Sequence, residues 1–186
     1  MRRLVLALVV SLGCGGSGGA KDGGAGGKRL FVTSLEHNGV FVGFGGMTKG
    51  LDGADAFCAS VAGSASLGGK WKAWLSDSTT DAISRLDDVG PWVLLNGIKA
   101  FESKSSLASL PLVPLEVDEK GTSTKLSRSG VWTGTKTGGT HTATTCGDWS
   151  QQSDSGQAGE TATTVAWTLS VISQCDNTYR LYCLEQ

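Results

Sequence analysis

The chain has 186 residues and a formal net charge of −1, with 39% apolar residues and six tryptophans. That length suits one domain with a tail, and the apolar content supports a packed core, which excludes a wholly disordered chain. From Arg29 onward there are 12 basic and 16 acidic side chains, a formal net charge of −4. Because the basic residues form no cluster that could bind phosphates, we expect no nucleic acid among the partners.

The N-terminal residues carry the pattern of an export signal. Two arginines precede a short apolar stretch, residues 4–12, which is too short to span a bilayer. Cys14 follows a small residue, as in the lipobox of bacterial lipoproteins, where the signal is cleaved before a cysteine that is then acylated. We therefore expect a signal peptide at 1–13 and a lipid anchor on Cys14. An ordinary secretory signal is the alternative, and both interpretations export the domain.

A glycine-rich stretch, residues 15–28, follows the cysteine and predicts a flexible tether of roughly 20 Å. Glycine rather than aspartate after Cys14 resembles lipoproteins that are sent to the outer membrane. The predicted parts are a signal peptide (1–13), an anchored cysteine with its linker (14–28) and a folded domain (29–186). The lipid at Cys14 would hold the protein to the outer membrane, on its periplasmic face or at the cell surface.

Short strands and a few helices are predicted along the domain. Asn96-Gly97, between apolar runs at 91–95 and 98–101, is the strongest short hairpin signal. Apolar spacing predicts a helix over 54–62, with Asp52 as its N-cap and Cys58 on its buried face. The other predicted elements are strands at 29–34, 40–42, 70–75, 131–134 and 166–168, and helices at 78–86 and 103–110.

The last predicted strand, within residues 174–185, organises the fold. Its residues alternate with period two, which places Cys183 on an apolar face with Tyr179 and Leu181. A polar region at 135–164 is predicted to be a long irregular loop. Because strands and helices do not alternate regularly, we expect an α+β fold. Its sheet should be mostly antiparallel, with two or three short helices.

Five cysteines occupy positions 14, 58, 146, 175 and 183. With Cys14 reserved for lipid, four remain in an exported domain, and disulfides are their expected role. Four cysteines allow three pairings, and both Cys58 and Cys146 are available to Cys183. Cys146 and Cys175 bracket much of the polar region, so a bond between them could pin it. No cysteine or histidine has the spacing of zinc ligands.

Several sequence blocks resemble endostatin, the C-terminal fragment of collagen XVIII, and occur in the same order. They are GADAFC (53–58), GKWKAWLS (69–76), SGVWTG (129–134), CGDW (146–149) and YCLE (182–185). The chain is more similar still to endostatin-like domains of bacterial lipoproteins, including the leptospiral endostatin-like surface proteins. The resemblance covers nearly all of 29–186 and implies a C-type-lectin-like fold. It also implies nested disulfides, Cys58–Cys183 outside and Cys146–Cys175 inside.

Several ligand sites of such relatives have no counterpart in this sequence. The calcium-binding triplets of lectins are missing, no histidine precedes the first strand, and the domain has only four arginines. We therefore expect no cofactor and no metal.

Catalytic patterns are equally weak. In the domain, residues 29–186, no serine lies in a Gly-x-Ser-x-Gly elbow, and His141 with Asp148 is a base-and-orienter pair only in principle. His37 is interpreted as a turn residue, and Trp149 as packing on a disulfide in preference to stacking on a sugar. Asp87-Asp88 and the acidic residues Glu116, Asp118 and Glu119 are interpreted as solvated surface.

We thus expect a non-enzymatic module that binds a protein, matrix or glycan ligand without calcium. The alternatives are an envelope enzyme with an unrecognised site and a purely structural envelope protein.

Overall fold

A computed structural model describes residues 26–124 and 130–186. The predicted signal peptide, Cys14 and most of the linker lie outside the described residues. The elements in chain order are β1 (Lys28–Val32), η1 (Phe44–Gly46), α1 (Gly50–Ser64), β2 (Trp71–Ala73), α2 (Ala82–Arg85), β3 (Trp92–Leu94), β4 (Lys99–Phe101), η2 (Lys104–Ala108), β5 (Gly130–Trp132), α3 (Cys146–Trp149), β6 (Ser155–Glu160), β7 (Val171–Gln174) and β8 (Tyr182–Glu185).

Five strands form the larger sheet, in the order β2-β8-β1-β3-β4. The last strand of the chain thus lies inside this sheet and pairs antiparallel with both β1 and β2. Only the β1–β3 pair is parallel, and β3 and β4 form the hairpin that Asn96-Gly97 predicts. The mostly antiparallel α+β fold expected from the sequence is confirmed.

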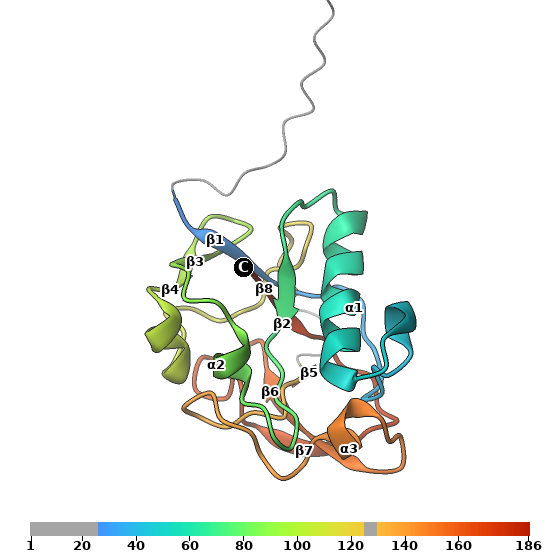
Figure 1. The fold of residues 1–186 in the computed structure, drawn as a ribbon. Helices are drawn as coiled ribbons and strands as arrows, with labels where there is room; N and C mark the ends of the chain where they lie inside the picture. The colour runs from blue at the N-terminus through green and yellow to red at the C-terminus, as the bar shows by residue number, and fades with distance from the viewer. Residues whose placement is uncertain (1–25, 125–129) are drawn as a thin grey trace, which may run out of the picture.

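Both faces of the larger sheet are buried. On one face Phe31 and Cys183 pack under α1, and on the other Leu30 and Tyr182 pack among tryptophans that include Trp92. Alternation along β8 therefore separates two cores, whereas a strand at the surface would separate a core from solvent. The long helix and the short α2 and η2 elements lie to either side of the sheet (Figure 1).

The long helix α1 is covalently joined to the centre of this sheet. Cys58, on its buried face, forms a disulfide with Cys183 of β8, with 5.6 Å between their Cα atoms. The expectation that Cys58 faces the core is confirmed. The predicted cap is wrong, since the helix begins earlier, at Gly50 after Lys49, and Asp52 lies in its first turn.

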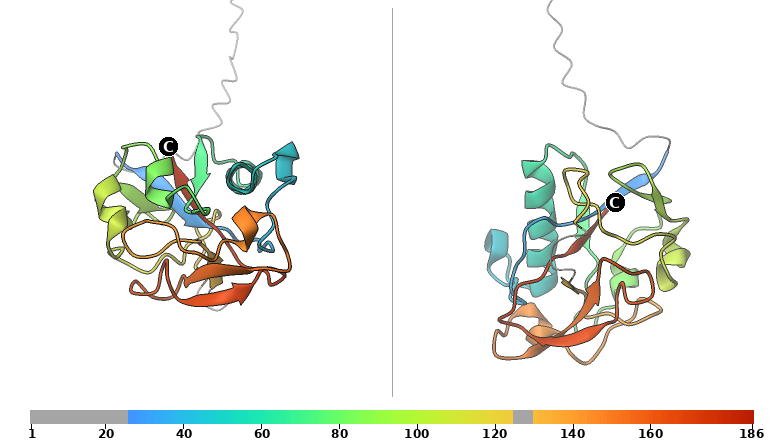
Figure 2. Two further views of the ribbon diagram at one scale, coloured as in Figure 1. Left: turned by 60° about the horizontal axis from the view of Figure 1, so that its bottom comes forward. Right: turned by 180° about the vertical axis from the view of Figure 1, so that it is seen from behind.

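A smaller sheet of three strands, in the order β5-β6-β7, forms the other end of the domain. The described chain begins at Gly26 beside β1, and in all three views that point and the smaller sheet lie at opposite ends (Figures 1 and 2). In the described part of the chain, no helix is both long enough and apolar enough to span a membrane.

Three predicted elements are wrong. Residues 40–42 form no strand, because Phe41 and Val42 instead donate backbone N–H groups to the carbonyl of Trp149. Residues 166–168 form a turn rather than a strand. The region 135–164 is not wholly irregular, since it contains α3 and β6, the central strand of the smaller sheet.

Candidate functional site

The end of the domain opposite Gly26 is the candidate site. We call it the distal face and define it as strands β5, β6 and β7, the turn α3, and the segment 135–145. Most of this face comes from the polar region that the sequence predicts to be a loop. Its parts are fixed in place by a backbone turn, a disulfide and a few long-range hydrogen bonds.

The turn α3 has left-handed backbone geometry throughout. Its four residues, Cys146–Trp149, have φ angles of 53°, 56°, 56° and 62°. L-amino acids disfavour this region by roughly 1–2 kcal/mol each, and only glycine and, occasionally, asparagine or aspartate adopt it routinely. Only Gly147 among these four is a glycine, so surrounding contacts must stabilise the turn.

Trp149 supplies two of those contacts. Its ring N–H donates to the backbone carbonyl of Ser76 at 2.7 Å, and its own carbonyl accepts the N–H of Phe41 at 2.8 Å. The side chain is fully buried and packs edge-to-face on Trp132. Trp149 is therefore a core residue, and it is not exposed for stacking on a sugar.

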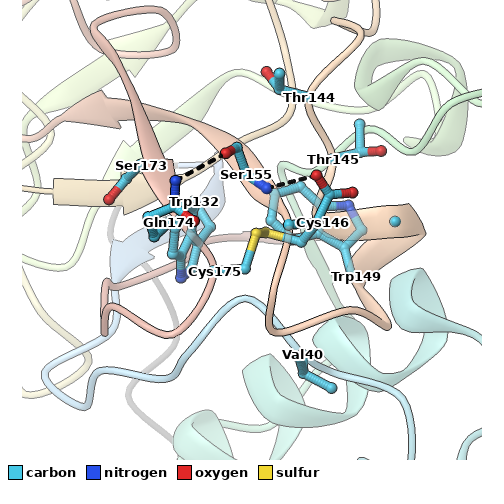
Figure 3. Close-up of a disulfide and its surroundings, with 12 residues drawn as sticks. Val40, Trp132, Thr144, Thr145, Cys146, Trp149, Ser155, Ser173, Gln174 and Cys175 are labelled. Atoms are coloured by element: carbon cyan, nitrogen blue, oxygen red, sulfur yellow. Dashed lines mark hydrogen bonds between the residues drawn. A yellow bond between two sulfur atoms is a disulfide. The ribbon is translucent and has the colours of Figure 1, made fainter.

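The second disulfide holds the same turn from its other end. Cys146 and Cys175 are bonded and fully buried, with Cα atoms 5.7 Å apart, and Trp132 and Trp149 lie beside them (Figure 3). A Cβ atom on Gly156 would stand 2.6 Å from the sulfur of Cys146, so only glycine fits there. Both disulfides join the cysteines that the resemblance implies.

Asp148 and His141 are not paired with each other. Asp148 accepts hydrogen bonds from the backbone N–H and hydroxyl of Ser78, at 2.8 and 3.0 Å. His141 places its Nδ1 atom 2.6 Å from a carboxylate oxygen of Asp81, which also accepts the backbone N–H of His141. The base-and-orienter pair proposed from the sequence is therefore replaced by two separate contacts. Asp81 is the residue that sequence reasoning missed.

The contact with His141 changes the titration of Asp81. Hydrogen bonds from the backbone and then the ring of His141 lower the pKa of the Asp81 carboxyl below its ordinary value of 3.8. Lys136, on the same hairpin as His141, adds a smaller effect of the same sign. Both partners are partly exposed, so this pair is a surface clasp that holds the 135–141 hairpin against the start of α2.

The other residues singled out from the sequence have structural places. His37 is more than a turn residue, since it bridges to Tyr179 and stacks on Phe41 with ring centroids 4.8 Å apart. Asp118 and Glu119 are buried, which corrects their assignment to solvated surface. Asp118 accepts backbone N–H groups in its own turn, and Glu119 accepts the N–H and hydroxyl of Ser34.

Asp87 and Asp88 are exposed after α2. Among residues 26–124 and 130–186, no group of three or more His, Cys, Asp or Glu side chains is arranged to hold a metal ion.

Acidic side chains outnumber basic ones on and around the distal face, where Lys136 is the basic residue of the segment 135–145. Between residues 137 and 179 the chain has no lysine or arginine, whereas it has four carboxylates, at Asp148, Asp154, Glu160 and Asp176. The face is thus fixed in place by several long-range contacts, and it is polar with more acidic than basic side chains. Such a surface can recognise a ligand through shape, hydrogen bonds and charge.

A scan against protein-family models and a search of curated proteins find no match to this chain.

Proposed function

We propose that the chain is an exported lipoprotein of the outer membrane whose folded domain is a non-enzymatic binding module. In this proposal Cys14 carries the lipid, the glycine-rich linker acts as a tether, and the distal face holds a protein, matrix or glycan ligand. The domain is proposed to be endostatin-like, with a C-type-lectin-like fold. Binding needs no metal, cofactor or nucleic acid.

The placement of the distal face carries this proposal. A tether that enters at Gly26 leaves the opposite end of the domain directed away from the anchored surface. At that end a left-handed turn is maintained by a buried disulfide and by the bond from Trp149 to Ser76. Strained backbone that its surroundings hold in place is typical of recognition surfaces and other functional sites.

The hydrogen-bond partners of His141 and Asp148 favour a binding function over a catalytic one. His141 is oriented by Asp81, while Asp148 is occupied by Ser78 in closing a loop. A general base needs its nucleophile within hydrogen-bond reach. Within the part of the chain that the structure describes, the His141 ring pairs with the carboxylate of Asp81 and not with a serine, threonine or cysteine side chain.

The binding proposal is tested with residues 29–186 applied to an array of purified matrix proteins, envelope proteins and glycans. We expect saturable binding to at least one component in the presence of EDTA. The double variant Ser78→Ala with Asp148→Ala removes the hydrogen bonds that tie α3 to the neighbouring loop and should weaken that binding. Binding that requires calcium, or turnover of a component, would overturn the proposal.

The anchor has its own test. Labelled palmitate should enter the wild-type protein in cells, and Cys14→Ser should abolish the labelling, while a Cys58→Ser control should keep it. Equal labelling of the wild type and Cys14→Ser would exclude lipidation at this residue.

A further inference from the structure

The edges of the two sheets differ in how they are covered. Edge strands carry unpaired backbone groups and are usually protected by charge, by a bulge or by a neighbouring segment. In the larger sheet, the outer N–H of Ala73 on β2 donates to the carboxylate of Asp55 at 2.8 Å. On β4, Ala100 accepts the N–H of Leu112 at 2.9 Å, and Lys99 pairs with Glu102.

One edge of the smaller sheet is covered as well. Along β5, the N–H of Trp132 donates to the carbonyl of Arg180 at 3.0 Å, and the N–H of Arg180 donates to Gly130 at 3.1 Å. The other edge is β7, which pairs with β6 on one side. Among the described residues no other strand or bridge pairs with β7, and the carbonyl of Gln174 at its end accepts the N–H of Asn177 at 3.1 Å.

The β7 edge is also apolar and uncharged. Its four residues are Val171, Ile172, Ser173 and Gln174, and the two aliphatic ones are 48% and 58% exposed. Two more aliphatic side chains lie shortly before β7 in the sequence. Val165 is 70% exposed and Leu169 is 42% exposed. Four exposed aliphatic residues thus lie within eight positions of the chain, and Val171 and Ile172 place one aliphatic side chain on each face of the strand.

Carboxylates lie at both ends of this edge. Glu160 accepts the hydroxyl of Ser170, just before β7, at 2.6 Å. At the other end, the backbone carbonyl of Asp154 accepts the N–H of Cys175, and Asp176 is exposed. An apolar, uncharged edge between acidic ends is complementary to an apolar extended segment with basic residues on its flanks.

We propose that the β7 edge binds an extended polypeptide segment by strand addition, and that this segment is apolar in its middle and flanked by lysine or arginine. The inference rests on the proposed binding function and names its partner class as protein. A four-residue strand extends about 13 Å, so the paired part of the ligand is about as short. Main-chain hydrogen bonds to β7 hold it, while side chains on alternate positions meet Val171 or Ile172.

A second copy of the chain fits this edge less well. Pairing β7 with β7 of another copy would bring two sets of acidic ends together, with no basic side chain between residues 137 and 179 of either copy. Like charges within a Debye length of about 8 Å repel at physiological salt. The edge also lies opposite the start of the domain, so a soluble partner reaches it from the side away from the tether.

Synthetic peptides test the proposal directly. The probes are twelve-residue peptides with alternating Val, Ile and Thr in the middle, in matched sets flanked by lysine or by glutamate. We expect lysine-flanked peptides to bind the full-length protein about tenfold more tightly than glutamate-flanked ones, and the difference to shrink in high salt. N-methylation of alternate peptide nitrogens should abolish binding, because it removes the main-chain donors without changing charge.

Variants of the protein locate the edge. Ile172→Lys and Ile172→Glu should both weaken lysine-flanked peptides about tenfold, since either charge blunts a strand edge. Ile98→Lys is the matched control, because Ile98 is 49% exposed on the hairpin of the other sheet. If Ile172→Glu bound lysine-flanked peptides more tightly than the wild type does, charge attraction alone would explain their binding, and strand addition would be overturned.

The remaining outcomes are also decisive. Failure of every lysine-flanked peptide to bind at about 1 mM would overturn the inference, as would concentration-dependent dimerisation that Ile172→Lys abolishes. If the array identifies a ligand whose binding Ile172→Lys leaves unchanged, the inference fails while the proposed binding function stands. If no ligand binds in either format, both fail.

Discussion

The two sheets of this domain differ in what surrounds them. The larger sheet is buried on both faces, and its central strand β8 is bonded to α1 through Cys58–Cys183. The smaller sheet has an exposed edge at β7, and a left-handed turn and one disulfide fix the loops beside it. One end of the domain therefore supplies stability, and the other presents polar loops and an exposed strand edge.

The largest effect should follow from removing the disulfide of the larger sheet. Cys58 and Cys183 are separated by 125 positions, and closing such a loop stabilises a fold by about 5 kcal/mol on the chain-entropy model. We therefore expect Cys58→Ala with Cys183→Ala to lower the free energy of unfolding by about that amount, measured by urea unfolding. A loss below about 1 kcal/mol would show that α1 is held by packing alone.

The disulfide of the distal face should matter less and act locally. Cys146 and Cys175 are separated by 29 positions, for which the same model gives about 3.5 kcal/mol. In Cys146→Ala with Cys175→Ala, amide hydrogen exchange should quicken in α3 and β7 and stay slow in β1 and β8. Equal acceleration in both sheets would contradict the division between a stable end and a presenting end.

The sequence predicts the larger sheet better than the smaller one, for physical reasons. Asn96-Gly97 marks its hairpin because only a few residue pairs suit such a tight turn. Period-two alternation locates β8, and helical spacing places Cys58 on the buried face of α1. These are local signals, and burial in the larger sheet agrees with them.

The candidate site depends on contacts that no local pattern encodes. Strand β6 reads SGQAGE, without a β-branched or aromatic residue, and is a strand because β5 and β7 pair with it on either side. The turn at Cys146–Trp149 is left-handed because distant groups such as Ser76 and Cys175 hold it. The Val171-Ile172 pair is the one sequence signal that could have located β7.

The ion pair between Arg29 and Glu185 in the larger sheet should make the free energy of unfolding depend on pH. Burial acts to raise the pKa of Glu185, but hydrogen bonds from Arg29 outweigh it and lower the pKa below its ordinary value of 4.5. A lowered folded-state pKa means that this stabilisation is present above the ordinary value and is lost as pH falls through the folded value. The free energy of unfolding should therefore fall on acidification below 4.5, less steeply in Glu185→Gln.

The wild type must be compared with Glu185→Gln, because Asp55 also titrates in acid and changes the free energy of unfolding in the opposite direction. Burial raises the pKa of Asp55 against the attraction of Arg85, 2.8 Å away. Its contribution therefore favours the folded state below its ordinary pKa and is lost as pH rises through the folded value. An identical pH profile in the wild type and in Glu185→Gln would exclude the role assigned to Arg29 and Glu185.

The smallest effect belongs to the clasp on the distal face. Asp81 and His141 are partly exposed, and pairs of this kind contribute less than about 1 kcal/mol. Asp81→Asn should lower the free energy of unfolding by less than that, with the difference present above pH 3.8 and lost as pH falls through the lower folded value. Asp88→Asn, at an exposed position after α2, is the matched control.

Carboxyl NMR titration of Asp81 checks the cause, since His141→Gln should move the pKa of Asp81 back toward 3.8. An unchanged pKa in that variant would mean that the ring of His141 does not hold the hairpin. The 135–141 segment would then depend on its backbone contacts alone.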